Sequence, residues 1–369
     1  MSLSYERALK AINLEPTDRI PQWPVMDCPA FVQELTGIDP HEHPQRAMLR
    51  LTELLDLDIS RVPTSDEPSQ VRFAEGQDVA LDAEGHEVVR WGTGSTSGWD
   101  WGKKFCTVEE VLAFEPLDHL AEMPLAHSGA RHDFRKPVAD LAYEFGEPHR
   151  QLQELVGARA LVNGSFYLTL FMWPLMTFGW EFFFEASLRE PGRFKEILDQ
   201  FASISCKVME AWSLTDVRCF VSHDDLCYKQ GPICSPRWLR ANVYPWYEVM
   251  WRPLRARGIK VVFLSDGNVD QVVDDVFAAG ADGILGEPTT NYEAIAKRYG
   301  QSKIIVGNAD GRILLLGSRE DVYAEVARCT RLGRECPGYF YSTTNNIPWN
   351  VPVENVKAFF EACAEMGAR

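Results

Sequence analysis

The sequence lacks the marks of secreted and membrane proteins. Its nine cysteines show neither a CxxC pair nor a regular spacing, and no apolar signal region follows the first residues, so a secreted disulfide framework is not expected. The most apolar stretch, residues 166–184, is interrupted by Pro174, Gly179 and Glu181, which argues against a membrane span. We expect a cytoplasmic protein with reduced thiols and no transmembrane segment.

Positive charge is also scarce. The chain has 37 Lys and Arg against 53 Asp and Glu, a formal net charge of -16, and the acidic residues are spread along the sequence. Such a surface repels nucleic-acid phosphates and anionic lipids. We predict a small-molecule substrate as the partner, and neither nucleic acid nor a membrane.

What the sequence does contain is an alternation of strand-like and helical segments. Eight short apolar runs read as strands: residues 19–26, 57–63, 158–165, 219–225, 260–266, 282–287, 303–308 and 338–343. Eight strands alternating with helices is the count for a (β/α)8 TIM barrel. No GxGxxG or P-loop follows any run to favour an open doubly wound sheet. We predict one α/β barrel domain over residues 1–369.

One segment, residues 67–130, interrupts this alternation. Polar and apolar residues alternate between glycines over 71–106, a pattern typical of β-hairpins. An excursion that leaves from the end of strand two would lie over the C-terminal face of the barrel. We predict a β-hairpin insertion there, which carries Trp91, Trp99 and Trp101 toward the site or packs on itself at the surface.

Polar residues at the ends of strands four to six are the site candidates, those on strands four and five for catalysis and Glu287 for substrate binding. His223 and Asp225 end the fourth run, Asp266 ends the fifth and Glu287 ends the sixth, so their side chains should meet at one end of the barrel. An imidazole could protonate a leaving group, and close carboxylates could share a proton, hold a cation or divide acid and base roles. The structural alternative is a hydrogen-bonded histidine and loop-capping aspartates.

The same set, with Asn345 after strand eight, could hold a divalent metal, although no spacing singles one out. Phe166 and Tyr167 follow strand three, and Trp349 follows strand eight. Single aromatic residues are more often core, yet this placement predicts that some of them face the ligand. Such a lining fits an apolar, ring-sized substrate.

Several sequence blocks resemble the uroporphyrinogen decarboxylase superfamily, whose (β/α)8 barrels include decarboxylases and cobalamin-linked methyltransferases. The blocks occur in order along nearly the whole chain. They are residues 19–26, Asp224-Asp225 with 231–236, Ser265-Asp266-Gly267-Asn268, Gly317 and residues 347–355. The resemblance is specific for the superfamily and much less so for the reaction.

Two departures narrow what the resemblance implies. In the decarboxylases an Arg-rich run after strand one engages the tetrapyrrole carboxylates, but here Met26 is followed by Asp27. A substrate carboxylate buried beside Asp27 would add repulsion to desolvation, which disfavours a polycarboxylate porphyrinogen. Asp27 is therefore a substrate-binding candidate. Asp66 matches the family's aspartate after strand two, so the resemblance implies a catalytic role for it.

The second departure concerns zinc. The methyltransferases of the superfamily bind zinc through a His-x-Cys after strand five and a Cys after strand eight. The matching positions here are Leu264, Asp266 and Asn345. All three ligands are changed, so a thiolate zinc site is not expected.

These features predict a methyltransferase-like enzyme. It would move a methyl group from a small methoxylated or N-methylated compound to cobalamin on a separate corrinoid protein, because eight strands use the length of the chain. The alternative is a decarboxylase or lyase that acts on a small carboxylic acid through Asp66 and the His223 cluster. A ligand-binding barrel without activity is disfavoured, since many titratable groups would crowd one face without a chemical task.

Overall fold

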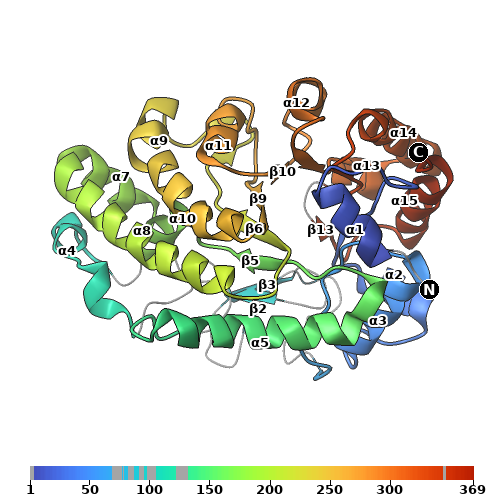
Figure 1. The fold of residues 1–369 in the computed structure, drawn as a ribbon, viewed down its shortest axis with the longest axis horizontal. Helices are drawn as coiled ribbons and strands as arrows, with labels where there is room; N and C mark the ends of the chain where they lie inside the picture. The colour runs from blue at the N-terminus through green and yellow to red at the C-terminus, as the bar shows by residue number, and fades with distance from the viewer. Residues whose placement is uncertain are drawn as a thin grey trace.

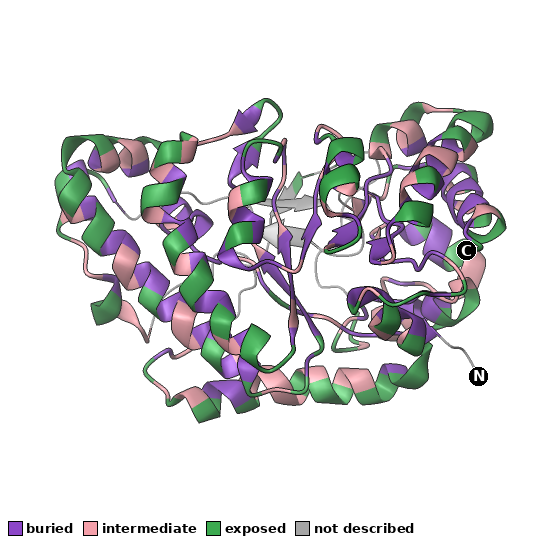
Figure 2. Ribbon diagram, turned by 45° about the horizontal axis from the view of Figure 1, so that its top comes forward, coloured by how far each residue is buried: buried purple, intermediate pink, exposed green. Residues whose placement is uncertain are grey.

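A six-stranded parallel sheet forms most of the wall of a barrel in the computed structural model (Figure 1). The structure describes residues 4–68, 77, 79–81, 87–90, 95–97, 105–121, 132–343 and 346–369. The order of the six strands is β12 (Tyr339–Phe340), β11 (Ile304–Val306), β10 (Gly283–Leu285), β9 (Lys260–Leu264), β6 (Cys219–His223) and β5 (Gly164–Phe166). The strands are short and mostly buried, as parallel strands covered on both faces must be (Figure 2).

Backbone hydrogen bonds through the first two strand-like runs close this sheet into a ring. They join Tyr341 N to Pro21 O at 2.8 Å, Ile59 N to Gln22 O at 3.1 Å, and Ser60 N to Leu161 O at 3.1 Å. In addition, β1 (Val25–Met26) pairs in parallel with β13 (Asn346–Ile347). The predicted (β/α)8 barrel is therefore confirmed.

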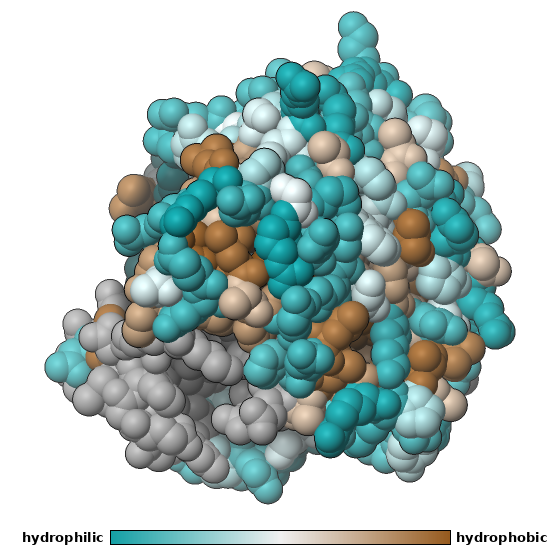
Figure 3. Space-filling model, turned by 90° about the vertical axis from the view of Figure 1, so that its left-hand side faces the viewer, coloured by the Kyte–Doolittle hydropathy of each residue, from teal (hydrophilic) through white to brown (hydrophobic). Residues whose placement is uncertain are grey.

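Helices surround the ring and turn their buried sides toward it (Figure 2). Their bounds are α2 (Pro29–Thr36), α3 (Pro44–Leu55), α4 (Val108–Leu112), α5 (Val138–Val156), α6 (Met172–Phe178), α7 (Trp180–Arg189), α8 (Pro191–Ser213), α9 (Pro236–Asn242), α10 (Tyr244–Ala256), α11 (Val273–Ala279), α12 (Tyr292–Tyr299), α13 (Gly311–Leu316), α14 (Arg319–Glu335) and α15 (Val353–Met366). The face shown in Figure 3 is mostly hydrophilic with scattered apolar patches, as the acidic composition leads one to expect.

The first helix, α1 (Ser4–Ile12), closes the N-terminal end of the barrel. Its Ala8, Ala11 and Ile12 are buried in one cluster with interior strand residues that include Val221 and Val262. Spacing of three and four residues puts these side chains on one face of the helix. The interior of the barrel is thus packed, and α1 closes its N-terminal end.

An ion-pair network fastens α1 to the barrel. Arg7 Nη1 lies 2.6 Å from Asp58 Oδ1, and Arg7 Nε lies 2.7 Å from Asp18 Oδ1. Arg19 contributes a second guanidinium, 3.6 Å from Asp58. Because Asp58 is fully buried, its charge depends on these two arginines.

The segment after the second strand contains three short strands that pair antiparallel in the order β2 (Val79–Leu81), β3 (Glu87–Arg90) and β4 (Ser95–Ser97). Their connecting turns, together with Trp91, Trp99 and Trp101, lie outside the described residues. The hairpin insertion and its place over the C-terminal face of the barrel therefore stay predictions. Among the described residues, no helix is long and apolar enough to cross a membrane.

Candidate active site

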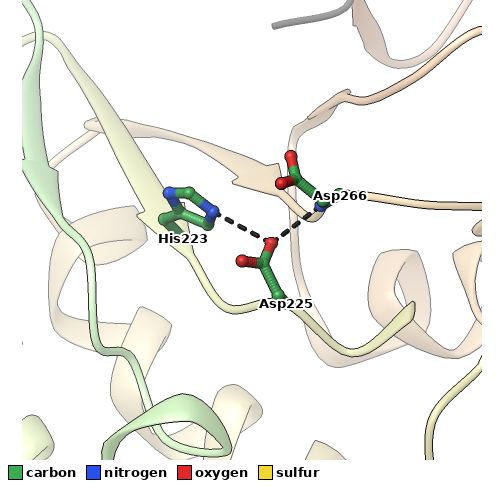
Figure 4. Close-up of side chains that lie close together, drawn as sticks. All are labelled: His223, Asp225 and Asp266. Atoms are coloured by element: carbon green, nitrogen blue, oxygen red, sulfur yellow. Dashed lines mark hydrogen bonds and ion pairs between the residues drawn. The ribbon is translucent and has the colours of Figure 1, made fainter. Parts of the chain in front are cut away.

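Three of the predicted side chains meet at the C-terminal ends of two neighbouring strands, β6 and β9 (Figure 4). His223 is the last residue of β6, and Asp225 and Asp266 each follow their strand by two residues. Asp225 Oδ1 accepts hydrogen bonds from His223 Nε2 at 3.0 Å and from the backbone N–H of Asp266 at 2.8 Å. These three residues, chosen because they lie at the ends of predicted strands, are thus close together in space, and Asp225 links the two strands.

The cluster is crowded with negative charge. Burial and the nearby carboxylates of Asp225 and Glu287 together raise the pKa of Asp266 to about 7, against the opposing effect of His223. Glu287 follows β10, the neighbour of β9. Its carboxylate accepts a hydrogen bond from the backbone N–H of Gly267 at 3.1 Å, which links the loops after these two strands. The side chains of His223 and Asp225 remain 14% and 18% exposed, so a ligand can reach them.

A buried aspartate that the sequence did not single out as functional holds this end of β6 in place. Asp224 accepts backbone hydrogen bonds from Leu170, Phe171 and Met172 at 2.7–2.9 Å, and one from Tyr247 Oη at 2.6 Å. Successive residues of an extended chain point to opposite sides. Asp224 therefore faces the helices, while its two neighbours face the cluster.

The two predicted aromatic residues take different places: Phe166 ends β5, and Tyr167 begins the loop that Asp224 anchors. The Tyr167 ring lies edge-on to His223, with ring centroids 4.2 Å apart. Phe166 is only 8% exposed and packs edge-on against the buried Trp173. Tyr167 thus lies against the cluster, whereas Phe166 packs in the core, and its role in substrate binding stays a prediction.

Asp27 lies at the same end of the barrel, after β1. Its Oδ2 accepts a hydrogen bond from Asn346 Nδ2 at 2.9 Å. Burial raises the pKa of Asp27, while Asn346 and the charge of Arg61 oppose the rise. The sequence pointed to Asn345, which lies outside the described residues. It missed Asn346, because only the pairing of β1 with β13 reveals that side chain.

Asp66 is engaged elsewhere. It accepts a hydrogen bond from the backbone N–H of Arg46 at 2.9 Å, in the first turn of α3, and binds the Arg46 guanidinium at 2.5 Å. It is thus a capping residue for that helix, and its catalytic role stays a prediction. Trp349 follows β13 and is half-buried.

Comparison with known proteins places this barrel in a family. The model of the family described as Uroporphyrinogen decarboxylase (URO-D) matches residues 159–366, more than half of the chain, including the cluster. The chain belongs to the URO-D family. A search of the curated proteins finds no match.

Among solved structures, one that matches over the full length shares this fold. A "methyltransferase from Methanosarcina mazei" is 18% identical, covers 99% of each chain and has a TM-score of 0.62, which establishes the shared fold. "IOLI protein with a binding zinc atom" is 11% identical and covers 63% of this chain and 81% of that one, with a TM-score of 0.33. A Bacillus sp. JAMB-750 endo-beta-1,4-mannanase domain is 11% identical, with coverage of 95% and 94% and a TM-score of 0.32. The last two scores are too low to support a conclusion.

The zinc site of the URO-D methyltransferases does not fit this chain. Leu264 and Asp266 occupy two of the ligand positions that the resemblance assigns to a histidine and a cysteine. A hydrocarbon side chain offers no ligand atom, and a carboxylate is a harder ligand than a thiolate. His223, Asp225 and Asp266 instead offer one nitrogen and two oxygens, all within 4.8 Å of one another.

A cavity of about 580 Å³ opens elsewhere, between α13 and α14. Arg312, Arg328 and Arg331 contribute to its lining, together with Leu316. None of the cluster residues lines this cavity, so it is separate from the candidate active site.

Proposed function

We propose that the protein is a methyltransferase-like enzyme. It takes a methyl group from a small methoxylated or N-methylated compound and transfers it to cobalamin carried by a separate corrinoid protein. The observation that carries the proposal is the convergence of His223, Asp225 and Asp266 at the accessible end of the barrel. The full-length similarity in fold to a methyltransferase supports it.

The chemistry of demethylation explains why such a cluster is useful. When the bond between the methyl carbon and oxygen or nitrogen breaks, the leaving atom keeps the electron pair and becomes basic. Cobalamin on the partner protein would supply the electron pair for the new bond to carbon. An electrophile at the leaving atom lowers the barrier, and general acid help of this kind is typically worth about 10²–10⁴ in rate.

The surroundings of the cluster favour a donor that carries little negative charge. Asp27, Asp225, Asp266 and Glu287 all follow strands at this end of the barrel, so a polycarboxylate would meet repulsion. Tyr167, beside His223, offers a flat apolar surface. A neutral or weakly charged, ring-sized methylated compound suits both features.

Two substitutions test the proposal. His223→Ala and Asp266→Asn should each lower methyl transfer to a corrinoid partner at least tens of fold, because each removes a group that serves the leaving atom. Asp275→Asn, which alters a surface ion pair with Arg240, is the matched control and should transfer methyl at the wild-type rate. Circular dichroism checks that all three variants fold.

The outcomes separate this function from its rival. Normal methyl transfer by both cluster variants would show that the cluster is not the source of the electrophile. Release of carbon dioxide from a small carboxylic acid, without methylation of any corrinoid, would instead establish the decarboxylase that the family name suggests.

A further inference from the structure

The register between β6 and β9 places an imidazole where it can replace a missing one. His223 lies directly opposite Leu264 in this parallel pair, so the histidine stands one strand away from the position where the resemblance expects one, at the same height. Asp266 lies two residues beyond Leu264. The cluster thus combines ligand-type side chains from two strands.

We propose that His223 Nε2, Asp225 and Asp266 bind one divalent cation that accepts mixed nitrogen and oxygen ligands, such as Zn²⁺, Mn²⁺ or Co²⁺. The proposal rests on geometry. The three ligand atoms lie within 4.8 Å of one another. Around one ion with bonds of about 2.0–2.2 Å, neighbouring ligands lie about 3–3.5 Å apart. His223 Nε2 and Asp225 Oδ1, 3.0 Å apart, already have that spacing, and the Asp266 oxygen would have to come closer on binding.

The charge of the site favours a cation as well. Two carboxylates face one imidazole, and Glu287 adds a third negative group nearby. A divalent ion would neutralise part of this negative charge.

The ligands are also held in advance. The backbone N–H of Asp266 fixes Asp225 at 2.8 Å, and the buried Asp224 fixes the strand end between His223 and Asp225. Tyr167 packs against the imidazole ring and limits its rotation. Outer contacts of this kind orient metal ligands in proteins.

Three protein ligands leave coordination positions open for a small molecule. The role of the cation rests on the proposed function: it would give the leaving oxygen or nitrogen a positive partner as that atom takes the bonding electron pair. The hard ligand set separates this site from a thiolate zinc site, because carboxylates suit Mn²⁺ and other hard ions while thiolates suit softer ones.

Metal binding can be measured without a methyl donor. The full-length protein is treated with a chelator and titrated with Mn²⁺, Zn²⁺ and Co²⁺ in a calorimeter. We expect one equivalent of metal per chain. His223→Ala, Asp225→Asn and Asp266→Asn should each weaken binding by at least tenfold, while the surface variant Asp275→Asn should bind as the wild type does.

A fourth variant keeps the test valid if a truncated ligand disturbs folding. Asp266→Cys replaces one ligand by another, so its Co²⁺ form should gain a thiolate-to-cobalt charge-transfer band that the wild type lacks. Failure to bind one equivalent, binding that the cluster variants leave unchanged, or no such band would overturn the site. Equal methyl transfer by metal-free and metal-loaded protein would remove its role in catalysis while the binding result stands.

Discussion

Asp224 shows how much one buried carboxylate can organise. Burial raises its pKa to about 6, against the effect of Tyr247 and of the backbone N–H groups that donate to it, so the group is mostly ionised at neutral pH. Its four donors come from α10, from the loop after β5 and from the first residue of α6. The same loop carries Tyr167, which lies against His223. The position of the candidate site therefore depends on a residue that does not face it.

Replacing this carboxylate should be costly. Asp224→Asn turns an N–H₂ group toward backbone N–H donors, and each buried donor left without a partner costs about 1–3 kcal/mol. Tyr247→Phe removes one donor only and should cost about 1 kcal/mol. Urea denaturation followed by circular dichroism measures both. Equal stability of Asp224→Asn and the wild type would contradict the anchoring role.

Among single residues, the sequence predicted the ones that follow from strand ends and missed those that depend on tertiary pairing. His223, Asp225 and Asp266 come after apolar runs, and parallel strands bring such positions together. Asn346 binds Asp27 only because β13 pairs with β1. No local pattern announces a contact between residues more than three hundred positions apart.

Among the elements, α1 depends most on charge. Arg7 is buried and pairs with the buried Asp58 at the N-terminal end of the barrel. Arg7→Met would leave Asp58 with the more distant Arg19 alone, and breaking a buried pair in this way costs about 3–5 kcal/mol. Chemical denaturation of the variant measures the loss.

A double variant separates the charge effect from lost packing. Arg7→Met combined with Asp58→Asn should be more stable than Arg7→Met alone, because no uncompensated charge remains. If the double variant is the less stable of the two, the destabilisation comes from packing around the arginine stem and not from the ion pair.

The boundaries of the helices and strands also show what local sequence patterns fail to predict. The stretch over residues 235–258 forms two helices, α9 and α10, because Pro245 in the first turn of α10 has no N–H to continue α9. The aromatic helix α7 begins at Trp180, after Gly179 takes a positive φ of 78°. The second predicted strand, over residues 57–63, forms only an isolated bridge between Ile59 and Leu161. The pattern of one segment alone cannot specify how far it pairs with another.

At the scale of the whole molecule, the closed ring predicts cooperative unfolding. Every strand of the barrel has two neighbours, so opening either half breaks the hydrogen bonds along both edges that join it to the other half. We expect a single calorimetric transition for the full-length protein. Two transitions in the full chain would contradict the prediction of one domain over residues 1–369.

Helix α1 closes the N-terminal end of the barrel, so access to the candidate site is from the C-terminal end. A compound that reaches His223 enters past the C-terminal ends of the strands and must leave the same way, because Ala8, Ala11 and Ile12 stop the other end. A corrinoid protein docked over the C-terminal end would trap a bound compound in the site and block entry of another. The proposed reaction then has a compulsory order of binding and release. The methyl donor binds first and the corrinoid protein second, and the demethylated product leaves only after the corrinoid protein has dissociated.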